Sequence, residues 1–373
     1  MKPAWIADRM TRIEASGIRK AFDLSKKMVD PINLSIGLPD FDVPTPIQEA
    51  AIEAIQTGHN AYTLTLGLPE LREQIKHKIH AELDHPNREV IITSGTSGAL
   101  LLALCCTVNP GDEVILFDPY FVMYSNLVAL AGGTPVLIDT YPDFHIHVGR
   151  VADAITPRTK CMIVNSPNNP TGIVSTHDEM KALARLCSDR GILLISDEVY
   201  RSFCFDAPFH SPAESNEDVL VVDGYSKSLG MTGWRLGYAH GPAELIQEMA
   251  KLQQFSFVCA PAPLQTAVVK ADRIDMSPQV AAYKRKRDQV VAALAPHYEL
   301  AHPAGAFYAF PKIPAQFPNA TDFVAHAIAN NLLVIPGSVF SKHDTHFRIS
   351  YAASDRTLHR GLEILVRMAK QGR

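Results

Sequence analysis

Short apolar runs alternate with helical patterns through the middle of the chain. Four of these runs span Glu113–Phe117, Cys161–Val164, Ile192–Ile195 and Val219–Val222. They are apolar almost throughout instead of alternating with polar residues, which is typical of parallel strands that helices cover on both faces. The pattern therefore predicts an α/β fold built on a mostly parallel sheet.

Each predicted strand ends in polar, titratable or aromatic residues. The four ends are Asp118–Phe121, Asn165–Asn169, Ser196–Tyr200 and Asp223–Lys227. In open parallel sheets, ligands bind beyond the carboxyl ends of the strands. We therefore expect a binding site along this edge, with Lys227 among its groups.

The pattern changes near residue 275. Ser277 and Pro278 are expected as the N-cap and first position of a long amphipathic helix. The remainder is rich in Pro and Gly and predicts a smaller α/β domain, while the N-terminal residues have no strand pattern of their own. We predict a large domain over residues 45–275 and a small domain made of residues 1–44 and 276–373.

Length and composition restrict the kind of ligand. The chain has 373 residues, 20% of them charged, and a formal net charge of -4, so no basic surface for nucleic acid is expected. The longest apolar run, Ala99–Cys106, is far shorter than the ~20 residues of a membrane span. The N-terminal sequence MKPAWIADRM lacks the apolar core of a signal peptide. We expect a cytoplasmic protein whose partner is a small molecule, not nucleic acid or a membrane.

Cysteine and histidine patterns predict neither disulfides nor a metal site. The six cysteines form no CxxC pair, and we interpret them as reduced and mostly buried thiols. Among the fifteen histidines, His77, His80 and His85 lie in a Lys-rich stretch without an HExxH pattern. A solvated helix face is the better interpretation of these three residues.

The segment TSGTSGAL, from Thr93 to Leu100, has the composition of an anion-binding turn. Its small residues allow close approach of the backbone, and the helix that follows directs free N–H groups and a positive dipole end at a ligand. It matches neither the P-loop nor the GxGxxG motif, so a nucleotide is not expected. A tight turn without any ligand is an equal alternative. An anion site together with an arginine, an aspartate, a tyrosine and a lysine suits an aldehyde cofactor that carries a phosphate and a pyridine ring.

Seven motifs, in order, then give a resemblance that covers nearly the whole chain. They are INLSIGLPDFDVPTP from Ile32, YTLTLGLPELR from Tyr62, NNPTG from Asn168, SDEVY, SKSLGMTGWRLGY, PAGAFYAFP, and FRISYA from Phe347. Together they resemble the pyridoxal-phosphate-dependent aminotransferases of the aspartate aminotransferase type, which have the type I fold. The resemblance implies pyridoxal 5'-phosphate as cofactor, ping-pong transamination between an L-amino acid and a 2-oxo acid, and a homodimer with shared active sites.

The resemblance also implies roles for the residues around the cofactor ring. Lys227 matches the lysine that forms a Schiff base with the cofactor and then carries the substrate proton. Asp197 matches the acid that keeps the pyridine nitrogen protonated. Tyr200 and Asn169 match the hydrogen-bond partners of the phenolic oxygen, and Phe121 falls where the family stacks an aromatic ring on the pyridine.

The phosphate ligands implied by the resemblance are Arg235, Ser226 and the backbone turn at Thr96 and Ser97. Tyr62 matches a residue that reaches the phosphate of the neighbouring subunit. There is one departure, because some relatives carry a serine three residues before the lysine where this chain has Gly224.

Substrate binding is implied for Arg348, Asn169 and Gly37. Arg348 matches the arginine that binds the α-carboxylate, for which the planar guanidinium is well suited, and the backbone of Gly37 passes close to the substrate. The apolar segment Gln253–Gln265 favours aromatic or aliphatic amino acids. Taken singly, several of these residues have structural explanations: a buried ion pair for Arg348, a turn cap for Asp197, a core position for Phe121 and burial in its own subunit for Tyr62.

Two other functions remain as alternatives to transamination. A carbon–sulfur β-lyase would use the same cofactor and share the early steps. A transcription regulator would use an aminotransferase-like domain as a ligand sensor, but it needs a DNA-binding module, and the motifs begin by about Ile32.

Overall fold

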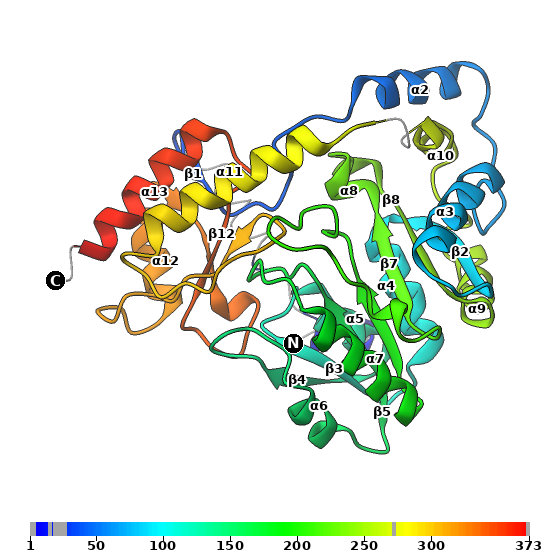
Figure 1. Ribbon diagram of the computed structural model, residues 1–373, viewed down its shortest axis with the longest axis horizontal. Helices are drawn as coiled ribbons and strands as arrows, with labels where there is room; N and C mark the ends of the chain where they lie inside the picture. The colour runs from blue at the N-terminus through cyan, green and yellow to red at the C-terminus, as the bar shows by residue number, and fades with distance from the viewer. Residues whose placement is uncertain (1–4, 14–16, 18–27, 271–273, 371–373) are drawn as a thin grey trace.

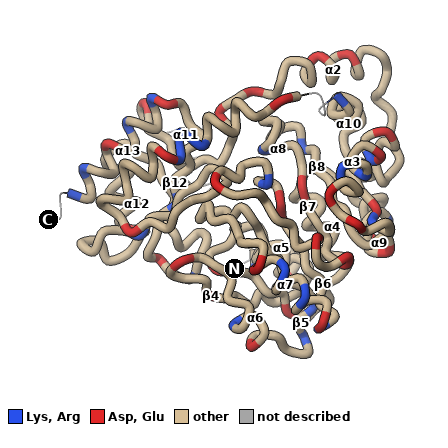
Figure 2. Tube along the Cα trace, in the orientation of Figure 1, with Lys and Arg blue, Asp and Glu red and all other residues tan. Residues whose placement is uncertain are grey.

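The computed structural model describes residues 5–13, 17, 28–270 and 274–370. Figure 1 shows two layered parts, a larger one around a central sheet and a smaller one that carries the C-terminal helices. No helix within the described ranges combines the length and apolar character that crossing a membrane requires. Figure 2 shows acidic and basic positions interspersed along α3, whereas α11 carries four consecutive basic residues, 284–287, followed by Asp288.

The larger part contains a seven-stranded sheet of order β2-β8-β7-β6-β5-β3-β4. Its strands are β2 (Arg88–Ser94), β3 (Glu113–Asp118), β4 (Thr134–Asp139), β5 (Thr159–Asn165), β6 (Leu193–Asp197), β7 (Leu220–Gly224) and β8 (Leu236–Pro242). Strands β4, β3, β5, β6 and β7 are parallel, whereas β8 is antiparallel to both of its neighbours. The α/β class and the mostly parallel sheet are therefore confirmed. Strand β8 was missed because its sequence, LGYAHGP, interrupts the apolar pattern with Gly and His.

The parallel strands β3, β5, β6 and β7 carry apolar runs because both faces of the sheet are covered there, whereas the edge strand β4 is mostly only partly buried. In β3, Ile115 and Phe117 belong to one hydrophobic core, while Val114 and Leu116 belong to another on the opposite face. Successive side chains of a strand point to opposite faces, so an uninterrupted apolar run serves two cores.

Helices on both faces complete the larger part. They are α2 (Thr45–Gln56), α3 (Pro69–Glu82), α4 (Gly95–Thr107), α5 (Met123–Ala131), α6 (Val148–Ala154), α7 (His177–Arg190), α8 (Tyr225–Ser228), α9 (Ala243–Gln254) and α10 (Ala262–Val268). Sequence signals fix several of their ends. Helix α7, for example, begins with a capping box between Thr176 and Glu179 and ends at Gly191 in the left-handed conformation.

The smaller part combines an antiparallel three-stranded sheet with three helices. Its elements are β9 (Tyr308–Ala309), β11 (Ile335–Pro336), β12 (Phe347–Ser350), α11 (Ser277–Leu294), α12 (Ala320–Ala329) and α13 (Asp355–Lys370). Strand β1 (Ile32–Asn33) pairs with β10 (Leu332–Leu333), so this N-terminal segment lies against the C-terminal part of the chain. The exact domain boundaries stay a prediction.

Helix α11 begins one residue earlier than expected. Ser277 is the first helical residue and follows Met276, so its assignment as the N-cap is wrong. Its hydroxyl donates a hydrogen bond to the carboxylate of Asp275 at 3.0 Å. The Ser277 side chain therefore does not cap the helix N-terminus.

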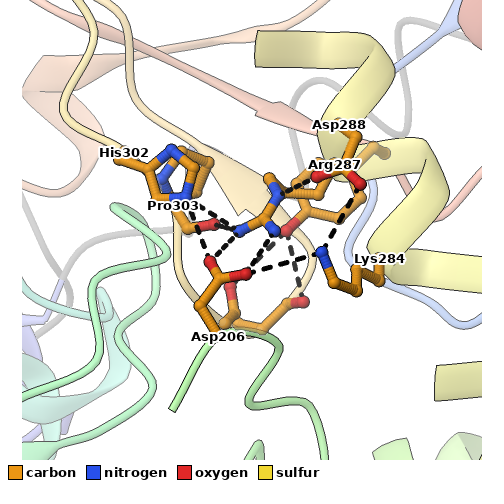
Figure 3. A network of polar contacts seen from close by, with 9 residues as sticks. Asp206, Lys284, Arg287, Asp288, His302 and Pro303 are labelled. Atoms are coloured by element: carbon orange, nitrogen blue, oxygen red, sulfur yellow. Dashed lines mark hydrogen bonds and ion pairs between the residues drawn. The ribbon is translucent and has the colours of Figure 1, made fainter. Parts of the chain in front are cut away.

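A buried arginine joins α11 to the long connection between β6 and β7 (Figure 3). The guanidinium of Arg287 is 1% exposed and bonds both carboxylate oxygens of Asp206, at 2.6 and 2.8 Å, and the carbonyl oxygen of Pro303 at 2.7 Å. Hydrogen bonds from Arg287 hold the pKa of Asp206 well below its usual range. The contact therefore links α11 in the smaller part to the connection that leads from β6 to β7 in the larger part.

Two interpretations of polar residues need correction. His77 and His80 do lie on the exposed face of α3, but His85 lies beyond its end and its Nε2 is 2.8 Å from the carbonyl oxygen of Ala213. The six thiols are free, yet only Cys161 and Cys187 are buried, because the other four lie nearer the ends of elements or on an outer face.

Candidate active site

The carboxyl ends of β5, β6 and β7 open into a cavity of about 570 Å³. This volume lies within the range of about 300–1,000 Å³ that is usual for small-molecule sites. Eleven of the twelve residues expected in the site line the cavity: Gly37, Thr96, Ser97, Phe121, Asn169, Asp197, Tyr200, Ser226, Lys227, Arg235 and Arg348. The twelfth, Tyr62, does not.

Lys227 lies in the short helix α8, directly after β7, and its side chain reaches the segment that follows β1. Its Nζ donates a hydrogen bond to the carbonyl oxygen of Gly37 at 3.0 Å. Desolvation, with the positive charges of Arg348 and Arg235, lowers the pKa of the amine from 10.5 to about 8. At pH 7 about a tenth of the amine is therefore unprotonated, far more than for an ordinary lysine, and can act as a nucleophile or a base.

Asp197 ends β6 and is buried. Its Oδ2 accepts a hydrogen bond from the hydroxyl of Tyr124 at 2.7 Å, and the N–H of Val199 donates to Oδ1 at 3.3 Å. Burial raises the pKa of Asp197 to about 6, although these two donors act in the opposite direction. The carboxylate is held in position by these two donors and, when ionised, can accept a hydrogen bond from a protonated nitrogen base.

Tyr124 is a site residue that the sequence reasoning missed. It is 2% exposed, lines the cavity and packs edge-on against Phe121, with ring centroids 5.7 Å apart. Phe121 lies two residues before α5 begins, and its carbonyl oxygen accepts a hydrogen bond from the N–H of Tyr124 at 3.0 Å, so the two residues share a turn that no motif had marked.

The first turn of α4 and Arg235 lie side by side on the wall of the cavity. The helix begins at Gly95, so its first N–H groups have no helical acceptor and face the cavity. The Nη2 of Arg235 lies 3.4 Å from the hydroxyl of Ser97, and its Nη1 donates to the carbonyl oxygen of Thr232 at 3.0 Å. Gly95 has φ +69°, and a Cβ there would lie 2.4 Å from Nη2 of Arg235, so a side chain would displace the guanidinium.

The glycine at position 224 has a packing explanation. A Cβ at Gly224 would lie 2.8 Å from the Cα of Gly237 on β8 and 3.2 Å from the carbonyl oxygen of Leu236. A Cβ at Gly237 would in turn lie 2.7 Å from the backbone nitrogen of Thr96. Strands β7 and β8 and helix α4 therefore approach too closely for the serine that some relatives carry.

Arg348 is fully buried in β12 and has no acidic partner in the described part of the chain. It donates to Oδ1 of Asn169 at 2.9 Å and to the carbonyl oxygen of Ser35 at 2.7 Å. The rings of Tyr308 and Phe340 each lie 4.6 Å from the guanidinium carbon, and the Nε finds no acceptor among the described residues. A buried cation without a carboxylate is costly, so this arrangement favours an anionic ligand over the structural ion pair considered above.

Gly37 passes directly over Tyr308. A Cβ at position 37 would lie 2.0 Å from the Tyr308 hydroxyl, which is itself 2.9 Å from the hydroxyl of Tyr200. Burial raises the pKa of Tyr200 well above 10, so its phenol stays protonated and can donate a hydrogen bond.

Tyr62 and the segment 253–265 lie outside this cavity. Tyr62 is 82% exposed, which excludes burial in its own subunit, and Leu64, two residues further along the chain, is exposed as well. The described lining contains no residue of 253–265. The suggestion that this segment shapes the substrate pocket is therefore not supported within one chain, because Gln253 and Gln265 are buried and bond the backbone of the segment around Leu66 instead.

Comparison with known proteins identifies the family. Residues 29–365 match the model of aminotransferase class I and II. The chain belongs to this family. It is similar to the aspartate/prephenate aminotransferase of Thermus thermophilus, with 37% identity and 94% of each chain covered, and to the aromatic-amino-acid aminotransferase 2 of Thermococcus litoralis, with 34% identity and 98% of each chain covered.

The fold comparison agrees with the sequence comparison. The structure of aspartate aminotransferase from Thermus thermophilus with maleate superposes with a TM-score of 0.93 at 35% identity, over 98% of this chain and all of the other. The chain is therefore an enzyme of the aminotransferase type I fold that transfers amino groups, and neither a lyase nor a ligand sensor is favoured.

Proposed function

We propose that this aminotransferase holds pyridoxal 5'-phosphate in the cavity and uses Lys227 as its reactive amine. The observation that carries the proposal is the convergence of Lys227, Asp197, Arg235 and Arg348, from four separate elements, on one cavity. Among the described residues, neither Arg235 nor Arg348 has a carboxylate partner, which suits a phosphate and a substrate carboxylate.

The residues present fit this cofactor group by group. The free N–H groups of α4, with Ser97, Ser226 and Arg235, would hold the phosphate. Asp197 would pair with the ring nitrogen, and the phenol of Tyr200 would donate to the phenolic oxygen. When bound, pyridoxal 5'-phosphate supplies an electron sink for the electrons that remain after the substrate Cα loses its proton.

Lys227 has the properties of both the attachment point and the proton carrier. With a pKa of about 8, its amine would be available both as the nucleophile that holds the cofactor and as a base for the Cα proton of the substrate. The hydrogen bond to Gly37 holds Nζ in position. Arg348 binds the α-carboxylate of the substrate and thereby orients the Cα–H bond toward Lys227.

We also infer a preference for aromatic or aliphatic amino acids. Apolar side chains line the cavity where the 3-10 helix η1 (Asp8–Arg12) lies against α5, and they include Ile13, Ile36, Leu38, Val122 and Met123. Among the described lining residues, the cations are the three already assigned to cofactor and α-carboxylate. A distal carboxylate finds no partner in this set.

The exposed Tyr62 supports a homodimer in which each subunit completes the other's site. Tyrosine is seldom left 82% exposed beside other apolar side chains without a partner surface. We propose that Tyr62 reaches the cofactor phosphate of the neighbouring subunit.

A panel of amino donors assayed with 2-oxoglutarate, pyruvate and oxaloacetate tests these proposals. We expect transfer from phenylalanine, tyrosine or leucine to exceed transfer from aspartate at least tenfold in kcat/KM. A preference for aspartate would contradict the side-chain inference alone. Pyruvate and ammonia released from a cysteine conjugate, with no 2-oxo acid acceptor, would contradict transamination itself.

A further inference from the structure

Two histidines and a glutamate gather outside the active site, at the start of α7 and at η2 (Pro212–Glu214). Ligand atoms of His177, His210 and Glu214 all lie within 4.8 Å of one another. The two imidazole rings are in contact, with centroids 4.9 Å apart at 69°. We propose that these three side chains form a binding site for a divalent transition-metal ion, with zinc as the best match.

The ligand set and its spacing suit zinc. Two imidazoles and a carboxylate, with water in the fourth position, make an open tetrahedral site. Atoms bound to one tetrahedral zinc lie about 3.4 Å apart, because Zn–N and Zn–O bonds are about 2.0–2.2 Å. Nδ1 of His210 and Oε2 of Glu214 are already 3.5 Å apart, so only the ring of His177 has to move closer.

The carboxylate is held in the orientation that the site needs. Oε1 of Glu214 accepts a hydrogen bond from the backbone N–H of Ser211 at 2.9 Å, which leaves Oε2 directed at His210. The hydroxyl of Ser211 donates to the buried carboxylate of Glu198 at 2.6 Å and anchors the turn. Such outer hydrogen bonds orient metal ligands and strengthen binding.

The surroundings favour a cation and allow it to enter. Asp178 and Glu179 occupy the first turn of α7, and Asp178 lies 3.4 Å from Nδ1 of His177. The side chains of His177, His210 and Glu214 are 46%, 32% and 36% exposed, so water can complete the coordination. A bound ion would join α7 to the connection between β6 and β7, the strands that lead to Asp197 and Lys227.

The sequence gives no sign of this site, because the two histidines lie 33 positions apart in the chain. The fold brings them together through the contact of α7 with η2.

Equilibrium dialysis of the metal-free, cofactor-loaded enzyme against Zn²⁺, in a buffer that does not chelate, tests the proposal. We expect about one ion per chain with a rise in the melting temperature. Both His177→Asn and Glu214→Gln should weaken zinc binding at least about tenfold, since loss of an outer partner alone costs about 10–100-fold. Glu214→Gln keeps a carbonyl oxygen for the Ser211 N–H, so the turn should stay folded.

His359 and Glu363 on α13 provide the matched control. Like His210 and Glu214, they are a histidine and a glutamate four positions apart, with Nε2 and Oε1 3.2 Å from each other. Among the described residues, no third ligand joins this pair. His359→Asn should leave zinc binding unchanged, and none of these variants should alter amino transfer in the absence of zinc. Wild-type protein that takes up no zinc, or zinc that both site variants retain, for example on the exposed Cys105, would overturn the proposal.

Discussion

Removing the hydroxyl of Tyr124 should make cofactor binding more sensitive to acid. In Tyr124→Phe, the carboxylate of Asp197 loses its 2.7 Å donor and keeps only the longer bond from the N–H of Val199. A hydrogen bond to a charged group contributes about 1.5–3 kcal/mol, and one pH unit of pKa corresponds to about 1.4 kcal/mol. The pKa of Asp197 should therefore rise from about 6 by roughly one to two pH units.

The direction of the pH dependence follows from the role of the carboxylate. Asp197 must be ionised to pair with a protonated ring nitrogen, so affinity for the cofactor falls as pH drops through the pKa of Asp197. In the wild type this loss should centre near about pH 6, and in Tyr124→Phe near about pH 7–8.

The assay is the dissociation constant of pyridoxal 5'-phosphate for the cofactor-free enzyme across this pH range. Titrations of the cofactor's own groups are common to both proteins and cancel in the comparison. Tyr141→Phe is the control, because its hydroxyl bonds that of Ser341 at 3.0 Å and does not line this cavity. Identical pH profiles for wild type and Tyr124→Phe would refute the reasoning.

Three further predictions concern the binding of the substrate carboxylate, the packing around Gly224 and the sharing of the site between subunits. Arg348→Lys keeps the charge but loses the planar guanidinium that can form two parallel hydrogen bonds, so KM should rise at least tenfold for every amino acid. An effect on one class of substrate only would mean that Arg348 contacts the substrate side chain and not its α-carboxylate. Gly224→Ser should cost about 1–3 kcal/mol of stability through overpacking against Gly237; denaturant melts that show no loss would contradict this. A mixed dimer of Lys227→Ala and Tyr62→Ala chains should recover about half of the wild-type activity, because one site then receives both intact residues. No recovery in a verified mixed dimer means that the site is not shared.

The sequence predicted the parts of the fold that depend on local pattern. Four of the five parallel strands were visible because both of their faces are buried, so that β3 and β7 are apolar at almost every position. The fifth, the edge strand β4, was missed because Thr134 and Asp139 at its ends are exposed and its apolar run is short. Strand β8 was missed because close packing requires Gly237 where an apolar residue would have marked the strand. Short strands such as β1 and β10 contain two residues each and have no period to detect.

The site was predictable where a residue carries a distinctive motif and unpredictable where tertiary contacts decide. Lys227 and Arg348 were marked by their motifs, and the structure brings them to one cavity. Tyr124 acts on Asp197 from 73 positions away in the chain, and this contact depends on where the tertiary fold places the start of α5, which no local pattern predicts. The environment of Gly224 likewise depends on β8 and α4, whose approach is set by the sheet and not by the local sequence.

The measurement that tests the central claim most directly is borohydride reduction of the purified enzyme followed by peptide mapping. Lys227 lines the cavity together with Arg235 and Asp197, and the pKa of its amine is lowered to about 8. We expect absorption in the visible before reduction, its loss on reduction, and a pyridoxyl group on the peptide that contains Lys227. A label on any other lysine, or none in enzyme that still transfers amino groups, would contradict the account.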